Sequence, residues 1–388
     1  MADIVIIGGS IMGASIAYHL AMAGKAGDVV VIEPDPSYEW AAAPRSSGGV
    51  RLMHGLPENI EMSQYGRAVY KDFARLMDVD GQPGRFDFNE HGYMYLVAGA
   101  KNVDAITANW RAQTALGANI DLLDRAGLAD RFPSLHVDDI DAALHAPEDG
   151  FIDPHAAVIG FRRKAISLGV EFVQDRVVGI DATATRVTGV KLESGRDIAA
   201  ETVVNVAGAW GPAISAMVGM KMPVEPLRRM TFYFETKAEL ETMPLTKDPS
   251  GVTFRKEGAG YTAGLTRKDE PPGFNFEVEH ELFEQTLWPA LAHRVPAFES
   301  LKMIRSWAGH YALNRMDGNT IIGPWVGGLE NFYIATGFSG AGLQKGPAIG
   351  RAMTELLLHG EYRTIDLSRM SYQRVIDNAP LIEVGFSA

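Results

Sequence analysis

The first apolar runs of the chain predict a strand, a turn, a helix and a second strand in close succession. Residues 4–7 form an unbroken apolar run, which is typical of a buried parallel strand. Residues 14–23 indicate a helix, and another apolar run over 29–32 ends at Glu33. This order predicts a β–α–β unit at the start of the chain.

The remaining pattern predicts further helices, a group of short strands and a second unit of the first kind. Helical spacing of apolar residues indicates helices over 60–76, 101–117, 124–131, the stretch that ends at Gly169, and 279–293 with an interruption near Pro289. Short β runs fill 170–209 and return in "RRMTFYFE", "GVTFRK" and "GYTAGLT", as expected for a separate antiparallel sheet. Residues 331–360 again predict strand, glycine turn and helix.

The first turn, "IIGGSIMGASIAYHL", carries an altered dinucleotide-binding motif. Gly8 and Gly13 fit the outer places of the G-x-G-x-x-G frame, and Ser10 holds the middle place. Ser10 fits if its φ is negative, and its hydroxyl can then donate to a phosphate oxygen. The free N–H groups at the helix start would face a pyrophosphate. Glu33 lies where an adenosine-ribose acceptor is expected and would repel a 2′-phosphate, which disfavours NADP and leaves FAD or NAD.

Composition narrows the class of protein. At 388 residues, with 46% hydrophobic and 22% charged content, the chain is long enough for two globular domains, and no apolar run approaches a membrane span. The first strand begins so close to Met1 that no room is expected for a signal peptide, which favours the cytoplasm. A net charge of −12 argues against nucleic acid as a partner.

The content of metal-ligating residues excludes several kinds of site. The chain has no cysteine, so disulfides, thiolate metal sites and cysteinyl-linked flavin are excluded. No pair of histidine, aspartate or glutamate residues has metal-ligand spacing, so no metal is expected.

Several motifs, in this order, resemble the FAD-dependent amine and amino-acid oxidases, the superfamily of D-amino-acid oxidase, glycine oxidase and monomeric sarcosine oxidase. They are "IIGGSIMGASIAYHL", "SSGGVR", "DGFIDP", "TVVNVAGAWGP", "WAGHYALNRMDGNTIIGP" and "FYIATGFSGAGLQKGPAIG". The likeness is greatest to sarcosine-oxidase-like bacterial enzymes and to mitochondrial FAD-dependent oxidoreductase-domain proteins, and it covers nearly the whole chain. It implies an α/β fold with a Rossmann-type FAD-binding domain (1–84, 148–216 and 305–388) and an α+β substrate domain on an antiparallel sheet (85–147 and 217–304).

The resemblance also implies which residues hold FAD. The turn residues would hold the pyrophosphate, the backbone of Val177 would meet adenine, and the backbone N–H groups of Leu343 and Gln344 would face the flavin N1/O2 edge. The expected set is Gly8, Ser10, Ile11, Met12, Gly13, Glu33, Ser46, Ser47, Gly48, Val177, Ala207, Gly208, Trp210, Gly309, Gly337, Phe338, Gly340, Gly342, Leu343 and Gln344. Gly309 stands where sarcosine oxidases carry the attaching cysteine, and no histidine stands near Ser46 and Ser47, so FAD is expected to be non-covalent.

The substrate side departs from the family pattern. Tyr311 matches a substrate-site tyrosine, and Gln344 replaces the carboxylate-binding lysine, with Lys345 adjacent. The lysine associated with oxygen activation aligns with Thr262 and an active-site histidine with Thr266. A substrate carboxylate needs a cation, and the candidates are Arg51, Arg255, Arg305 and, less favoured, Arg267.

The expected activity is oxidation of the C–N bond of a small amino acid or secondary amine, such as an N-substituted glycine, to an imine that hydrolyses. Oxygen, giving hydrogen peroxide, or another carrier would reoxidise the flavin. The alternatives are a FAD-dependent 2-hydroxy-acid dehydrogenase, for which no matched histidine base is found, and a flavin-bearing assembly or scaffold protein.

Overall fold

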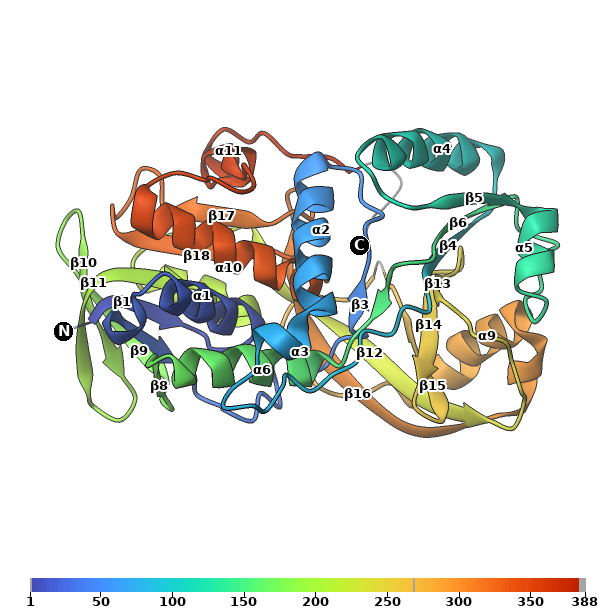
Figure 1. The fold of residues 1–388 in the computed structure, drawn as a ribbon, viewed down its shortest axis with the longest axis horizontal. Coiled ribbons are helices and arrows are strands. Elements are labelled where there is room, and N and C mark those ends of the chain that lie inside the picture. Colours follow the sequence, from blue (N-terminus) through green and yellow to red (C-terminus); the bar gives the residue numbers. More distant parts are fainter. Residues whose placement is uncertain (1, 268, 384–388) are drawn as a thin grey trace.

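Two eight-stranded sheets organise the chain in the computed structural model, which describes residues 2–267 and 269–383 (Figure 1). The first sheet has a parallel part in the order β18-β11-β1-β2-β8. Its strands are β1 (Ala2–Ile7), β2 (Val29–Ile32), β8 (Glu171–Val173), β11 (Asp197–Asn205) and β18 (Phe332–Thr336). Three antiparallel strands extend this part: β17 (Ile321–Pro324) beside β18, and β10 (Val187–Leu192) and β9 (Val177–Ala182) beyond β11.

Three long helices pack side by side on the first sheet (Figure 1). They are α1 (Ile11–Met22), α6 (Pro154–Ser167) and α10 (Gly342–His359). The helix predicted over 14–23 therefore begins earlier, directly after Ser10, which occupies the N-cap position. Helices α1 and α10 can approach closely because Gly350 and Gly346 have no side chains. A Cβ on Gly350 would lie 2.2 Å from Ser15 Oγ, and one on Gly346 would lie 2.8 Å from the side chain of Ile11.

The second sheet is antiparallel except where β13 runs parallel to β4. Its order is β16 (Leu301–Asn314), β12 (Val224–Thr236), β15 (Gly260–Leu265), β14 (Val252–Glu257), β13 (Leu245–Lys247), β4 (Tyr93–Val97), β6 (Ala142–Ala146) and β5 (Asp121–Asp124). This sheet and the first confirm the predicted fold class. Because β16 pairs with β12 along its length, the proposed domain boundary at 305 falls inside this strand.

The remaining helices and one short strand pair lie around the two sheets. They are α2 (Pro57–Lys71), α3 (Phe73–Leu76), α4 (Ala100–Ala115), α5 (Arg125–Arg131), α7 (Gly211–Ala216), α8 (His280–Leu282), α9 (Trp288–Arg294), α11 (Gln373–Ile376) and the strand pair β3 (Gly49–Val50) and β7 (Gly150–Phe151). The interruption predicted near Pro289 is a π-helix, Phe283–Leu287, after which α9 begins with the proline in its first turn, where a missing N–H costs nothing.

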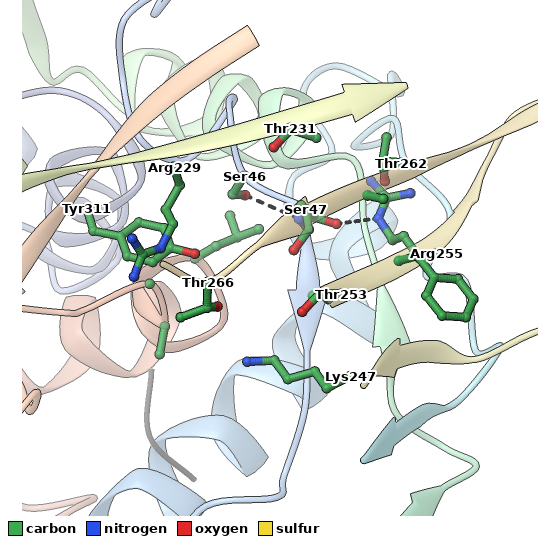
Figure 2. A pocket seen from close by; sticks show the side chains of 18 of the residues that line it. Ser46, Ser47, Arg229, Thr231, Lys247, Thr253, Arg255, Thr262, Thr266 and Tyr311 are labelled. Atoms are coloured by element: carbon green, nitrogen blue, oxygen red, sulfur yellow. Dashed lines mark hydrogen bonds between the residues drawn. The ribbon is translucent and has the colours of Figure 1, made fainter. Parts of the chain in front are cut away.

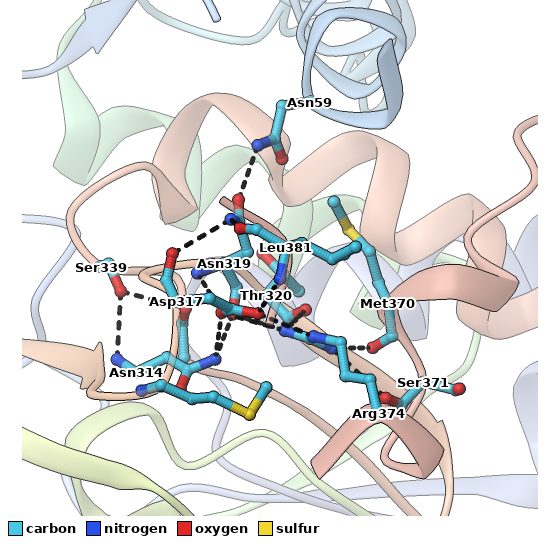
Figure 3. A network of polar contacts seen from close by, with 12 residues as sticks. Asn59, Asn314, Asp317, Asn319, Thr320, Ser339, Met370, Ser371, Arg374 and Leu381 are labelled. Carbon is cyan, nitrogen blue, oxygen red and sulfur yellow. Dashed lines mark hydrogen bonds and ion pairs between the residues drawn. The ribbon is translucent and has the colours of Figure 1, made fainter. Parts of the chain in front are cut away.

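A buried polar network connects residues 370–381, near the C-terminus, to the end of β16 and to α2 (Figure 3). Arg374 forms an ion pair with the buried Asp317 at 3.0 Å, and Asn319 accepts a hydrogen bond from Asn59 of α2. Ser339, in the glycine turn before α10, accepts from the Asn314 N–H at 3.1 Å. The network therefore ties that turn to the end of β16. Within the ranges that the structure describes, no helix combines the length and apolar character needed to cross a membrane.

Candidate active site

A cavity of about 580 Å³ opens beyond the carboxyl ends of β1, β2 and β11. Ligands of open parallel sheets bind at this edge, because the helix N-termini and connecting turns meet there. Most residues expected at the cofactor line this cavity: Gly8, Ser10, Ile11, Met12, Glu33, Ser46, Val177, Ala207, Gly208, Trp210, Phe338, Gly340, Gly342 and Leu343.

The first glycine turn has the geometry that close approach of a phosphate requires. Gly8 has φ +100°, and a Cβ on Gly13 would lie 1.8 Å from the Gly8 carbonyl oxygen, so both positions need glycine. Ser10 has φ −72°, which satisfies the condition for a side chain at the middle place. Its buried hydroxyl has no hydrogen-bond partner among the described residues. The turn therefore fits a diphosphate and offers it an unused donor.

Glu33 is held at the end of β2 with its carboxylate in the cavity wall. Its oxygens accept hydrogen bonds from the N–H of Gly9 at 2.8 Å and of Asp35 at 3.0 Å. Burial raises the pKa of this carboxyl group, and the two N–H donors oppose the shift. The residue lies where the sequence places a ribose acceptor.

A smaller cavity of about 140 Å³ lies between the glycine loop around residue 48 and one face of the second sheet (Figure 2). Ser46, Tyr311, Gly340 and Leu343 line both cavities, so the two spaces adjoin at Tyr311. Gly340 has φ +90°, and a Cβ there would approach the Tyr311 ring to 2.7 Å. The glycine turn before α10 and the tyrosine of β16 are thus packed directly against each other.

Among the described residues, five basic side chains and no carboxylate line the smaller cavity. They are Arg45, Arg51, Arg229, Lys247 and Arg255. Arg229 lies over the Tyr311 ring, 5.0 Å from its centroid, and Lys247 lies 5.5 Å from the Tyr95 ring. Burial, with Arg51 and Arg229 nearby, lowers the pKa of Lys247 to about 7. The cavity is therefore a place of positive charge in a chain of net charge −12.

Gln344 positions the loop that carries Arg51 instead of facing the cavity as a free amide. Its Oε1 accepts from the Arg51 N–H at 2.9 Å, and its Nε2 donates to His54 Nε2 at 2.7 Å. Burial and the nearby cations hold the pKa of His54 well below its usual value, so the imidazole is neutral and can accept this bond. The Arg51 guanidinium lies 5.5 Å from the Tyr95 ring. Lys345 turns away and donates to Asn59 at 2.7 Å.

Three of the four arginine candidates have their charges engaged elsewhere or lie outside the cavity. Arg255 donates to the carbonyl oxygen of Ser47 and pairs with Glu257. Arg267 pairs with Asp269 and Glu279, and Arg305 is exposed on β16 over the rings of Tyr233 and Trp307. These side chains satisfy other groups, so Arg51 is the candidate that the structure places at the cavity without an ion pair among the described residues.

The structure adds residues that the sequence did not indicate: Arg45, His54, Arg229 and Lys247. A signal for one of them was present in "RRM", because neighbouring residues of a strand point to opposite faces. Arg228 pairs with the buried Glu270 at 2.6 Å, and Arg229 faces the cavity. Pattern alone does not say which arginine points which way.

Other expected residues shape the cavities or complete their walls. Ser47, Gly48 and Gln344 line the smaller cavity, together with Thr262 and Thr266. Gly13, Gly337 and Gly309 do not line either cavity. Gly309 lies against Arg45, since a Cβ there would be 2.9 Å from the Arg45 Cβ.

A group of possible metal ligands, His136, Asp139 and His293, lies on the surface with ligand atoms within 4.8 Å of one another. Residue spacing did not indicate this group. The two terminal guanidinium nitrogens of Arg294 each donate to the Asp139 carboxylate at 2.9 Å. The Asp139 carboxylate is therefore already paired with a positive charge, and we interpret the three residues as part of an ion-pair cluster.

Comparison with known proteins identifies the class. The chain belongs to the family described as FAD dependent oxidoreductase (DAO), which matches residues 3–356, and FAD is its cofactor. Among its relatives, FAD-dependent oxidoreductase domain-containing protein 1 of Xenopus laevis is 36% identical over 98% of this chain and 84% of that protein. The mitochondrial sarcosine dehydrogenase of Homo sapiens is 25% identical over 92% of this chain and 40% of that protein. The crystal structure of L-proline dehydrogenase from P. horikoshii has a TM-score of 0.88 and 26% identity, covering 98% and 99% of the two chains.

Proposed function

We propose that the protein oxidises the C–N bond of a small amino acid or secondary amine of the N-substituted glycine type. The proposal rests on the smaller cavity, which is lined by basic side chains and adjoins the larger cavity, where FAD would bind, at Tyr311. Such a cavity suits a small carboxylate-bearing molecule. Sarcosine and L-proline, after which two of the relatives are named, are both amino acids with a secondary amine.

The cofactor would be held by the turn at Gly8 and Ser10, by Glu33 at the ribose and by the backbone near Val177. The N–H groups at the start of α10, at Leu343 and Gln344, would face the flavin ring, where the helix N-terminus favours negative charge. When bound, FAD supplies the acceptor for a hydride equivalent.

The residues of the smaller cavity would bind and orient the substrate. Arg229 would pair with its carboxylate, Arg51 would add positive charge near Tyr95, and the Tyr311 ring would form the wall that sets the angle of the α-carbon. Loss of a hydride from that carbon and a proton from nitrogen leaves a C=N bond. Water then adds to the imine and releases an amine and a carbonyl compound. Oxygen takes up the two electrons and two protons as hydrogen peroxide.

One observation supports the second candidate, a 2-hydroxy-acid dehydrogenase. Removal of a hydroxyl proton needs a base, and the pKa of Lys247 is lowered to about 7 in the cavity, so a neutral amine is available near neutral pH.

Anaerobic bleaching of the flavin separates the candidates. We expect N-methylglycine or proline to bleach the 450 nm band, and the corresponding esters, which lack the carboxylate charge, to act much more slowly. Bleaching by 2-hydroxy acids alone would establish the second candidate. A flavin that no member of either panel reduces would favour a flavin-bearing assembly or scaffold protein.

Precipitation with acid is expected to release all the yellow colour into the supernatant. Gly309 and the residues around Ser46 provide no thiol or imidazole for a covalent bond to flavin. The measurement is flavin absorbance in the pellet and the supernatant after trichloroacetic acid treatment. Colour that remains with the washed pellet would show a covalent link.

A further inference from the structure

The charges that line the smaller cavity exceed what one substrate carboxylate can neutralise. Arg255 is paired with Glu257, and Arg45 donates to the carbonyl oxygens of Glu39 and Ala308. Besides Arg45, whose guanidinium lies over the Trp40 ring, three lining cations, Arg51, Arg229 and Lys247, have no carboxylate at ion-pair distance within the described part of the chain. Arg51 donates to the carbonyl oxygen of Met53, and Arg229 to that of Arg228 at 3.2 Å. Glu383 and Asp149 act on Arg51 from beyond ion-pair distance, so neither arginine has a carboxylate in direct contact among the described residues.

These cations occupy two separate positions on one face of the second sheet. Arg229 lies on β12 and Lys247 on β13, with β15 and β14 between them. Neighbouring strands are about 4.8 Å apart, so the two backbones are roughly 14 Å apart. Figure 2 shows Arg229 beside Tyr311 and Lys247 well apart from both. Arg51 and Lys247 form the second position together, because the charged group of each lies 5.5 Å from the centroid of the Tyr95 ring.

The floor between the two positions is open and polar. One row of paired residues crosses the sheet from Lys247 through Thr253 and Gly264 to Thr231. Gly264 has no side chain to fill the middle of this row, and threonine hydroxyl groups stand on both sides of it. The space therefore suits a short, polar chain that reaches from one cationic position to the other.

Leaving both positions without an anion is costly. An unpaired charge that is partly removed from water is disfavoured, and like charges nearby add to that cost. The groups facing Lys247 are Arg51, Arg229, His54 and Tyr95, and the two arginines together with burial lower its pKa to about 7. A ligand that places one anion at each position removes this cost.

We infer that the cavity binds a ligand with two carboxylates, one at Arg229 and the other at Lys247 and Arg51. If the protein oxidises amines as proposed above, its substrate is an amine that carries a carboxylate on both sides of its nitrogen, such as an N-carboxyalkyl amino acid.

The binding test uses the holoprotein and two ligands that cannot be oxidised as amines. Glutarate and butyrate have the carbon skeletons of iminodiacetate and N-methylglycine with CH₂ in place of NH, and they differ by one carboxylate. By calorimetry we expect glutarate to bind at least about tenfold more tightly. Lys247→Met should remove this advantage by lowering the affinity for glutarate to about that for butyrate. Lys302→Met, on the exposed part of β16, is the matched control and should keep the advantage.

Proton uptake provides a second reading that a merely structural role for Lys247 would not give. At pH 8 a lysine with a pKa of about 7 is mostly neutral, and a carboxylate beside it raises that pKa, so glutarate binding should take up a proton. The heat of binding should then depend on the ionisation enthalpy of the buffer for the wild type and for Lys302→Met, but not for Lys247→Met.

The bleaching experiment separates this inference from the proposed function. Faster flavin reduction by iminodiacetate than by N-methylglycine supports both. Equal binding of glutarate and butyrate overturns the two-carboxylate inference, even where N-methylglycine bleaches the flavin. Preferential glutarate binding without bleaching by any amine supports the two-carboxylate cavity and overturns amine oxidation.

Discussion

Replacing Gly13 by valine is expected to abolish FAD binding. A Cβ at this position would lie 1.8 Å from the Gly8 carbonyl oxygen, a contact that no rotamer can relieve because both atoms belong to the backbone or are fixed to it. Valine would therefore push α1 away from the end of β1 and destroy the turn that faces the pyrophosphate. The measurement is the ratio of flavin to protein absorbance after purification, with circular dichroism to show that the variant is folded.

The matched control is Ser10→Gly in the same turn. Ser10 has φ −72°, which glycine adopts freely, so this variant should retain its flavin with at most a modest loss of affinity from the missing hydroxyl group. A folded Gly13→Val protein that purifies fully yellow would show that the pyrophosphate does not sit on this turn.

Replacing Arg229 by methionine is expected to lower the efficiency of flavin reduction without loss of FAD. Methionine keeps much of the packing against the Tyr311 ring but removes the charge that would pair with the substrate carboxylate. Loss of one partner from a buried charge pair costs about 2 to 5 kcal/mol, which is roughly thirtyfold to a few thousandfold in kcat/KM. Anaerobic stopped-flow reduction, scored beside flavin content, is the measurement.

Arg51→Met and Arg305→Met complete the series. Arg51 lines the cavity, so its loss should also slow reduction, whereas Arg305 is exposed on β16 and its loss should leave reduction unchanged. Normal reduction in both cavity variants with the best amino acid found would contradict carboxylate recognition and favour an amine without a carboxylate.

The first glycine turn could be predicted from the sequence, because the contacts that form it are local. Gly8, Ser10, Gly13 and Glu33 fall within one β–α–β unit, where glycine spacing and the length of one helix set the geometry almost completely. The resemblance to a family of FAD-dependent oxidoreductases, carried by motifs along nearly the whole chain, was confirmed by comparison.

The charge of the smaller cavity could not be predicted from the sequence, because it depends on non-local packing. Arg51, Arg229 and Lys247 come from a loop and two strands that are far apart in the chain, and pairing across the second sheet brings them together. Alternation along a strand defines two faces but does not say which face a cavity will use. Arg255 and Arg305 carry the same charge on strands of the same sheet, yet Glu257 engages one and solvent surrounds the other. A long cationic side chain extends towards the nearest counter-charge or water, and non-local packing decides where those partners lie.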